Sequence, residues 1–248
     1  MNVRMWRHPA TQRNLATLTH DGIAITGPED GEMACGEFGP GRMAEPNQIL
    51  AAVLELLKPK AQPLAGRKVV ITAGPTREPI DPVRFISNHS SGKQGYAIAT
   101  AAVELGAETV LVSGPASLPI PPGAQMIPVE TAREMLAACE GELPADIAIF
   151  TAAVADWRAA AEAPEKLKKT ADGPPHLVLT ENPDILATVS RHAARPRIVV
   201  GFAAETERVT EHAAQKLRKK GCDLIVANDV SIGSGIFGGD RNSVHLVS

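Results

Sequence analysis

Residues 68–106 read KVVITAGPTREPIDPVRFISNHSSGKQGYAIATAAVELG. The stretch begins with a short apolar run that ends in glycine, which is typical of a buried β-strand. Small and apolar residues follow at helical spacing further on, which predicts a helix over 92–106. Between the two lies NHSSGKQG, at 88–95, a segment rich in hydroxyls, amides and glycines. A strand that leads through a polar loop into a helix is the building unit of an α/β fold.

The same alternation continues to the end of the chain. Further apolar runs predict strands at 108–114, 145–154, 196–205 and 222–229. Amphipathic segments between them predict helices at 131–141, 182–194 and 206–221. Near-continuous apolar strands that alternate with helices predict a Rossmann-like, mostly parallel sheet flanked by helices on both faces. Ligands of such folds bind at the carboxyl ends of the strands, so we expect the site in the segments that follow them.

The first part of the chain has a different character. Residues 1–46 are rich in Gly, Pro, Met and Asn, and we expect irregular structure there. Residues 47–58 show helical spacing, with Asn47 as a candidate N-cap. The segment PKAQPLAGR, at 59–67, is punctuated by Pro and Gly and predicts a linker. We therefore expect one domain at 1–58, a linker at 59–67 and a second domain at 68–248.

Composition excludes several classes of protein. The net charge is −3 and the sequence pI is about 6.2, which argues against a general binder of nucleic acid or membrane surfaces. No apolar run approaches the roughly 20 residues of a membrane span, and the first residues lack a signal-peptide pattern, so we expect a cytoplasmic protein. The three cysteines are far apart and odd in number, which argues against a disulfide framework and a zinc site.

The polar loop at 88–95 has two possible roles. A helix N-terminus presents unpaired N–H groups and a partial positive charge, which suit a phosphate, and Ser90 and Ser91 add hydroxyls. Alternatively, one of these serines simply caps the helix, and the spacing alone does not decide between the two. The Walker A pattern is absent, because Ser87 and Gln94 stand where it needs Gly and Ser or Thr. The dinucleotide fingerprint is absent after the first strand as well, which weakens a classical NAD site.

Other strand ends carry charged residues with similar alternatives. Asp156 follows an apolar strand, where it would either hold Mg²⁺ beside a polyphosphate or cap a helix. EKLKK, at 165–169, is either solvated surface or a source of charge that neutralises phosphate. Lys216 and Lys220, one helical turn apart, share a face of the predicted helix, and this spacing alone indicates an exposed face. Asn182 is predicted to cap a helix that has Pro183 at its first position.

Together these segments resemble a known family. ITAGPTREPIDPVRFISNHSSGKQG, AAVADWR, EKLKK, NPDI, GFAAET and ANDV occur in this order in the phosphopantothenoylcysteine synthetases of bacterial coenzyme A biosynthesis. MNVRMW, PATQRN and MACGEFGPGRM resemble the end of the flavin-dependent phosphopantothenoylcysteine decarboxylase, the other part of the bifunctional enzyme. The resemblance covers almost the whole chain. It implies a nearly complete synthetase that is truncated at its C-terminal end. It also implies that the decarboxylase tail before it is inactive without the FMN-binding domain.

The resemblance also implies a reaction. The carboxylate of 4′-phosphopantothenate attacks the α-phosphate of CTP, and the amine of L-cysteine then displaces CMP from the acyl-cytidylate. Asn88 would orient the second step, Lys166 would neutralise the α-phosphate, and Arg84 would bind an anionic substrate group. Ala152 and Ala153 would leave space for the intermediate, and Asp156 would hold nucleotide or Mg²⁺. The CTP contacts implied are Ser90, Ser91, Gly92, Asp156, Lys166, Pro183, Asp184, Ile185, Leu186, Phe202, Lys216 and Lys220.

In the decarboxylase tail, the resemblance implies that Asn2 contacts the substrate carboxylate and that Cys35 is the proton donor. It also implies a homodimer formed through the synthetase domain, with small-molecule substrates as the other partners. Two alternatives stay open: an NAD(P)-binding oxidoreductase, which the alternation of strands and helices also permits, and a non-catalytic assembly module.

Overall fold

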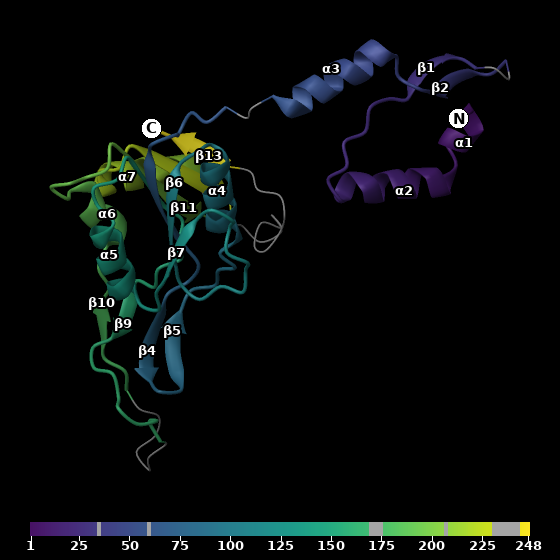
Figure 1. The fold of residues 1–248 in the computed structure, drawn as a ribbon. Coiled ribbons are helices and arrows are strands. Elements are labelled where there is room, and N and C mark those ends of the chain that lie inside the picture. Colours follow the sequence, from purple (N-terminus) through teal and green to yellow (C-terminus); the bar gives the residue numbers. More distant parts are fainter. Residues whose placement is uncertain (34–35, 59–60, 169–175, 206–207, 230–243) are drawn as a thin grey trace. The chain divides into compact units, whose positions relative to one another are not determined.

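The computed structural model describes residues 1–33, 36–58, 61–168, 176–205, 208–229 and 244–248. The chain divides into two compact units, Met1–Lys60 and Ala61–Ser248. Both are drawn in Figure 1.

The first unit is more regular than its composition suggests. It contains helices and one antiparallel hairpin, in the order α1 (Val3–Trp6), α2 (Pro9–His20), β1 (Glu29–Glu32), β2 (Phe38–Arg42) and α3 (Pro46–Leu57). Local signals account for this regularity. Asn2 caps α1 by accepting a hydrogen bond from the Met5 amide at 2.8 Å, and Pro9 lies in the first turn of α2. The expected cap at Asn47 is wrong, because α3 begins at Pro46 with Glu45 as its N-cap.

The second unit is built on a seven-stranded sheet with the order β13-β12-β11-β8-β3-β6-β7. All neighbouring strands are parallel except β12 and β13. In chain order this is the doubly wound arrangement 3-2-1-4-5-6 with one added antiparallel edge strand, and its switch point lies between β3 and β8. The strands are β3 (Lys68–Ala73), β6 (Glu108–Ser113), β7 (Gln125–Pro128), β8 (Ile147–Phe150), β11 (Ile198–Glu205), β12 (Leu224–Asp229) and β13 (Val244–Val247).

Helices cover both faces of this sheet, as the sequence predicts. On one face, Val69, Ile71 and Ala73 of β3 pack against Tyr96 and Ala99 of α4 (Lys93–Glu104). The opposite face packs against α5 (Ala132–Gly141), α6 (Ile185–Ser190) and α7 (Val209–Lys220). Figure 1 shows α4 apart from the other three helices. Both faces of the central strands are buried, and most of their residues are therefore apolar.

The close packing of α4 on the sheet depends on Gly95. A Cβ at this position would lie 2.5 Å from Ala73 Cβ and 2.6 Å from Thr151 Oγ1. We expect Gly95→Ala to lower the free energy of unfolding by about 1–3 kcal/mol, the usual cost of overpacking. Gly141→Ala is the matched control, because a Cβ there meets nothing within 4 Å. Urea unfolding followed by circular dichroism measures both, and equal midpoints for the two variants would contradict the prediction.

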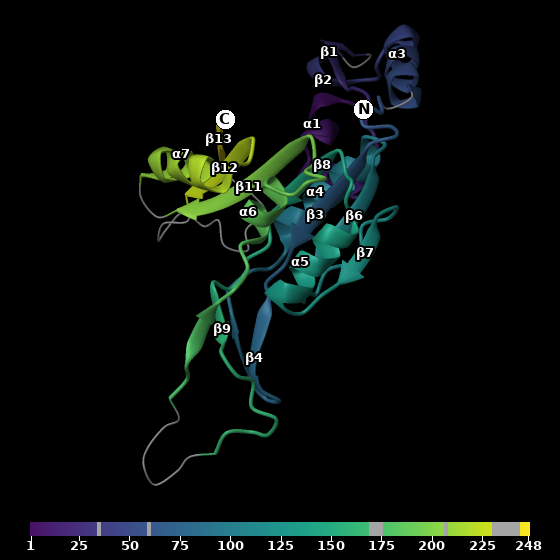
Figure 2. The same cartoon turned by 90° about the vertical axis from the view of Figure 1, so that its left-hand side faces the viewer.

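Two pairs of short strands extend beyond the carboxyl ends of the sheet (Figures 1 and 2). One hairpin, β4 (Arg77–Asp81) and β5 (Arg84–Ser87), lies in the connection between β3 and α4. The other pair, β9 (Trp157–Ala159) and β10 (Leu179–Glu181), follows β8, and β4 lies beside β9. These four strands lack the apolar runs from which the strands of the sheet are predicted. No helix in the described ranges is long and apolar enough to cross a bilayer.

Candidate active site

A pocket of about 460 Å³ lies at the carboxyl ends of β3, β8 and β11. This is the switch point of the sheet, where doubly wound folds bind their ligands. Many residues singled out by the sequence analysis line it. They are Ala152, Asp156, Pro183, Asp184, Ile185, Leu186, Phe202, Lys216 and Lys220.

Two buried threonines fix one wall of this pocket. The segment after β8 runs across the end of β3, and the Ala152 amide donates to Thr72 Oγ1 at 3.3 Å. The Ala155 amide donates to Thr76 Oγ1 at 3.0 Å. Ala153 bonds to the backbone of Gly74 and Thr76 and does not line the pocket. The segment therefore leaves β8 after Phe150, earlier than predicted, because its amides pair with the β3 loop.

Asn182 ties this wall to the segment that begins α6. Its Nδ2 donates to the Ala155 carbonyl at 2.8 Å, and its backbone amide donates to the Asp156 carbonyl at 2.8 Å. The predicted capping role of Asn182 is therefore wrong. Asp184 caps α6 instead, by accepting from the Ala187 amide at 3.0 Å. The sequence signal that was missed is an Asn directly after a short strand, at a point where two strand ends meet.

Lysines of α7 bring positive charge to the pocket. Lys216 Nζ donates to the Phe202 carbonyl at 2.7 Å, and Lys219 also lines the pocket. Lys220 forms an ion pair with Asp184. Burial raises the pKa of Asp184, but the Lys220 ammonium and the Ala187 amide outweigh burial and leave this pKa below its usual value. Lys216 and Lys220 both lie in α7 and both line this pocket, which agrees with the prediction that they share one face of a helix.

Asp156 presents an exposed carboxylate to the same pocket. It precedes β9, so the alternative role as a helix cap is wrong. The described residues contain no group of three metal-ligating side chains. A single carboxylate suits a Mg²⁺ ion that is held mainly by phosphates and water.

The polar loop before α4 is joined to the pocket by Asn88. Asn88 Nδ2 donates to the carbonyl of Val154, a lining residue, at 2.9 Å. Gly92 is the N-cap of α4 and has a positive φ of 75°, which favours glycine. Ser90 and Ser91 are therefore not the N-cap of α4. The hydroxyls of Ser90 and Ser91 instead accept from the amides of Gly92 and Lys93 at 3.2 and 3.5 Å.

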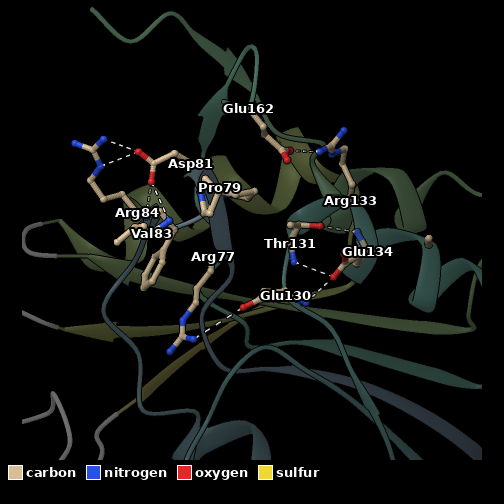
Figure 3. Close-up of a pocket in the computed structure, with 13 residues that line it drawn as sticks. Arg77, Pro79, Asp81, Val83, Arg84, Glu130, Thr131, Arg133, Glu134 and Glu162 are labelled. Carbon is tan, nitrogen blue, oxygen red and sulfur yellow. Dashed lines mark hydrogen bonds and ion pairs between the residues drawn. The ribbon is translucent and has the colours of Figure 1, made fainter. Parts of the chain in front are cut away.

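Arg84 lines a second pocket, of about 780 Å³, beside the β4–β5 hairpin and the start of α5. Figure 3 shows that arginines in this pocket face carboxylates. The pairs are Arg84 with Asp81, Arg77 with Glu130 at 4.0 Å and Arg133 with Glu162 at 2.9 Å. The structure thus places Arg84 and the lysines of α7 in separate pockets.

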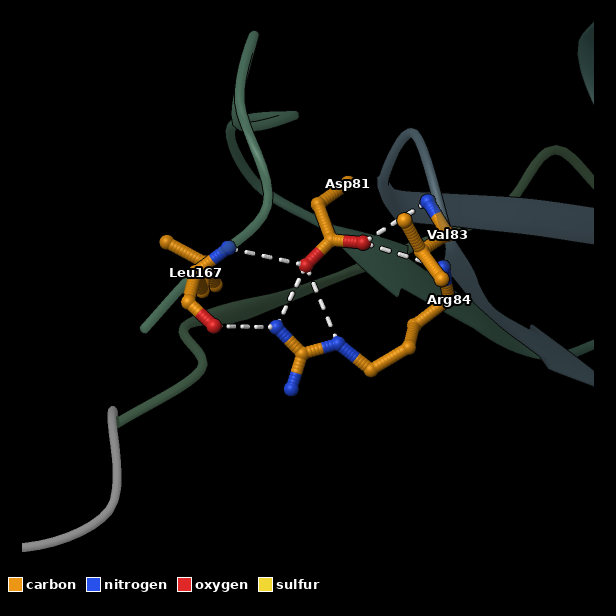
Figure 4. A network of polar contacts seen from close by, with 4 residues as sticks. All are labelled: Asp81, Val83, Arg84 and Leu167. Atoms are coloured by element: carbon orange, nitrogen blue, oxygen red, sulfur yellow. Dashed lines mark hydrogen bonds and ion pairs between the residues drawn. The ribbon is translucent and has the colours of Figure 1, made fainter. Parts of the chain in front are cut away.

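Lys166 is exposed and lines neither pocket. It lies in the segment after β9, and the next residue, Leu167, contacts Asp81 and Arg84 (Figure 4). Asn2 belongs to the first unit, where its side chain caps α1. Cys35 lies outside the described residues.

The fold and the pocket define a doubly wound α/β protein with a ligand site at its switch point. Residues 64–248 match the family described as the DNA/pantothenate metabolism flavoprotein C-terminal domain, and the chain belongs to this family. Residues 1–58 match the flavoprotein family.

The relatives carry a consistent name. Proteins from Vibrio vulnificus and Escherichia coli, each named coenzyme A biosynthesis bifunctional protein CoaBC, are 50% identical to the chain over 248 and 249 residues. The alignments cover 99% of this chain and 61% of each relative, so the chain spans about three fifths of their length. The resemblance inferred from the motifs is thereby confirmed.

Solved structures agree with these relatives. The C-terminal domain of a coenzyme A biosynthesis bifunctional protein CoaBC is 41% identical, with a TM-score of 0.60 over 76% of this chain and 89% of that domain. The DNA/pantothenate metabolism flavoprotein from Streptococcus pneumoniae is 22% identical, with a TM-score of 0.61 over 73% of this chain and 92% of that one. The second likeness is one of fold alone.

Proposed function

We propose that the second unit is a phosphopantothenate–cysteine ligase of coenzyme A biosynthesis that uses CTP. The observation that carries the proposal is the pocket at the switch point, where a wall of small residues, Asp156 and the α7 lysines meet. The names of the relatives, at 50% identity over nearly the whole chain, support the same reaction.

The reaction has two physical requirements that this pocket suits. A carboxylate is a poor acyl donor until one of its oxygens becomes part of a good leaving group. Its oxygen therefore attacks the α-phosphorus of CTP, and pyrophosphate leaves. Two anions must meet for this step, so positive charge and N–H donors have to surround them. Lys216 and Lys220 supply such charge from α7, and Lys166 would supply it from the segment after β9.

The second step joins the two substrates. The amine of L-cysteine attacks the acyl carbon, CMP leaves with the bonding electrons, and the nitrogen loses a proton. We assign Asn88 to this step because its amide contacts the Val154 carbonyl at the pocket wall. Ala152 lines the pocket with a small side chain, which leaves room for the acyl-cytidylate, and Ala153 would act only through its backbone contacts with Gly74 and Thr76.

The remaining assignments follow the same logic. Ser90, Ser91 and Gly92 would cradle phosphates, because the two hydroxyls accept from local amides and each keeps its O–H to donate. Asp156 would contact CTP and a Mg²⁺ ion that, when bound, neutralises phosphate charge. The other CTP contacts would be Pro183, Asp184, Ile185, Leu186 and Phe202. The NAD(P) alternative is weakened further, because β3 leads into the β4–β5 hairpin and not into a short glycine-rich turn.

We infer that residues 1–58 belong to the FMN-dependent decarboxylase part of a bifunctional protein. The match to the flavoprotein family supports this inference. The side-chain oxygen of Asn2 accepts from the Met5 amide in the α1 cap, which leaves its NH2 group to donate to a substrate carboxylate. Cys35 as a proton donor, a homodimer through the synthetase domain and a cytoplasmic location stay predictions.

One assay tests the proposed ligase. With CTP, Mg²⁺, 4′-phosphopantothenate and L-cysteine, we expect continuous release of pyrophosphate and CMP. Without cysteine, pyrophosphate release should stop at about one equivalent per chain, because the acyl-cytidylate has no acceptor. EDTA and the omission of phosphopantothenate are the controls, and NADPH binding is measured in parallel. A folded chain that releases no pyrophosphate, or that binds NADPH tightly, would overturn the proposal.

A further inference from the structure

The segment that carries Lys166 is anchored at the residue next to it. The Leu167 amide donates to Asp81 Oδ2 at 3.1 Å, and the Leu167 carbonyl accepts from Arg84 Nη2 at 2.9 Å. Arg84 Nε in turn donates to the same Asp81 oxygen at 3.0 Å. Figure 4 shows this closed set of contacts, in which the Asp81–Arg84 ion pair holds both the amide and the carbonyl of Leu167.

Asp81 is well suited to act as a fixed anchor. Its side chain has 0% exposure, whereas that of Arg84 is 44% exposed. Its other oxygen accepts from the amides of Val83 and Arg84 at 2.9 and 3.0 Å, so the hairpin turn itself orients the carboxylate. The Arg84 guanidinium holds the pKa of Asp81 well below its usual range. The carboxylate is therefore ionised and has few other orientations available near neutral pH.

The other anchors of the segment lie further from Lys166. The Ala163 amide donates to the Ile80 carbonyl at 2.9 Å, and Glu162 pairs with Arg133. Lys166 itself is exposed, and no hydrogen bond or ion pair of its side chain occurs within the described part of the chain. Its ammonium is thus available to a ligand, while the backbone beside it is fixed.

We propose that Asp81 and Arg84 are positioning residues that hold the Leu167 backbone and thereby place the Lys166 ammonium for the first step of the ligase reaction. The proposal rests on the role proposed for Lys166. It differs from the direct role in anion binding that the family resemblance implies for Arg84. If Arg84 only bound substrate, the loss of its carboxylate partner would leave its charge free and would not weaken binding.

Asp81→Asn separates the two roles. The substitution keeps an oxygen for the turn amides but removes the charge that holds Arg84 and Leu167. We expect faster hydrogen exchange of the Leu167 amide and a fall in kcat for pyrophosphate release by up to about 100-fold, with a smaller change in the KM for phosphopantothenate. Asp146→Asn is the matched control, because Asp146 accepts from the Lys68 amide at 2.9 Å and from Arg67 at 2.8 Å, away from this segment. It should raise exchange at Lys68 and leave kcat unchanged.

Hydrogen exchange of the Leu167 amide can be measured without the ligase reaction. Failure of the anchor can therefore be distinguished from failure of the proposed ligase. Unchanged exchange at Leu167 in Asp81→Asn would overturn the anchor, even in an inactive protein. Faster exchange with an unchanged kcat would show that the anchor does not serve Lys166. If Asp81→Asn does not fold, Arg84→Lys replaces it, since the side chain is partly exposed and its charge is kept. The anchor predicts a fall in kcat for Arg84→Lys, and a change confined to the KM for phosphopantothenate would contradict it.

Discussion

Replacing Lys166 with Gln is expected to lower the rate of pyrophosphate release by a factor of about 100 to 1,000. In the proposed first step, the oxygens on the α-phosphorus gain charge as the carboxylate of phosphopantothenate attacks. In its proposed role the Lys166 ammonium stabilises this charge, and a neutral amide would do so much less. Because Lys166 is exposed and lies outside the sheet, its loss should leave the fold unchanged.

Lys168→Gln is the matched control for this substitution. Lys168 is two residues further along, is also exposed, and belongs to the same run of charges. Both variants remove one positive charge from the segment, so any general effect on the attraction of anionic substrates is shared. Rapid-quench measurement of pyrophosphate in the first turnover compares them. Equal rates for the two variants would show that the run acts only through its net charge and that Lys166 has no particular role.

The sheet could be predicted from sequence because its strands carry a strong local signal. Strands such as Lys68–Ala73 are buried on both faces, so nearly every residue is apolar and the runs stand out. The strand pairs outside the sheet lack this signal. The residues of β4, Arg77–Asp81, include Arg, Glu, Pro and Asp, and they form a strand only because β5 and β9 lie beside them.

The site could be predicted in part for a related reason. Parallel strands bring their carboxyl ends to one edge, so Asp156 and Phe202 could be expected near one another from sequence alone. The contacts that organise the site depend on pairings between distant residues. The hydrogen bonds from Asn182 to Ala155 and from Leu167 to Asp81 join segments whose separation along the chain gives no local pattern.

The caps illustrate the same limit at short range. Asn is a residue type that is favoured at helix N-caps, yet neither Asn47 nor Asn182 caps a helix. In each case a neighbouring carboxylate residue, Glu45 or Asp184, takes the position. The reason for Asn182 lies in tertiary structure, since its amide is used to join two strand ends.

Asn88→Asp is expected to separate the two steps of the reaction. The side chain keeps its size but loses the N–H group that donates to the Val154 carbonyl at 2.9 Å. An ionised carboxylate would instead face that carbonyl and would repel the phosphate of an acyl-cytidylate nearby. Because we assign the charge for the proposed first step to lysines, this step should continue. The second step should slow by a factor of about 100 or more, because the intermediate is no longer held for attack by cysteine.

The pyrophosphate released and the acyl-cytidylate that accumulates show whether the two steps are separated. With all substrates present, Asn88→Asp should release about one equivalent of pyrophosphate per chain and then stall, with labelled acyl-cytidylate trapped on the protein. Lys166→Gln should trap none, so the two variants together order the roles of their residues along the reaction. Asn47→Asp, the same substitution at an exposed position of the first unit, controls for the added charge. Normal formation of the cysteine amide by Asn88→Asp would remove Asn88 from the mechanism, and loss of both pyrophosphate and amide would place it in the first step.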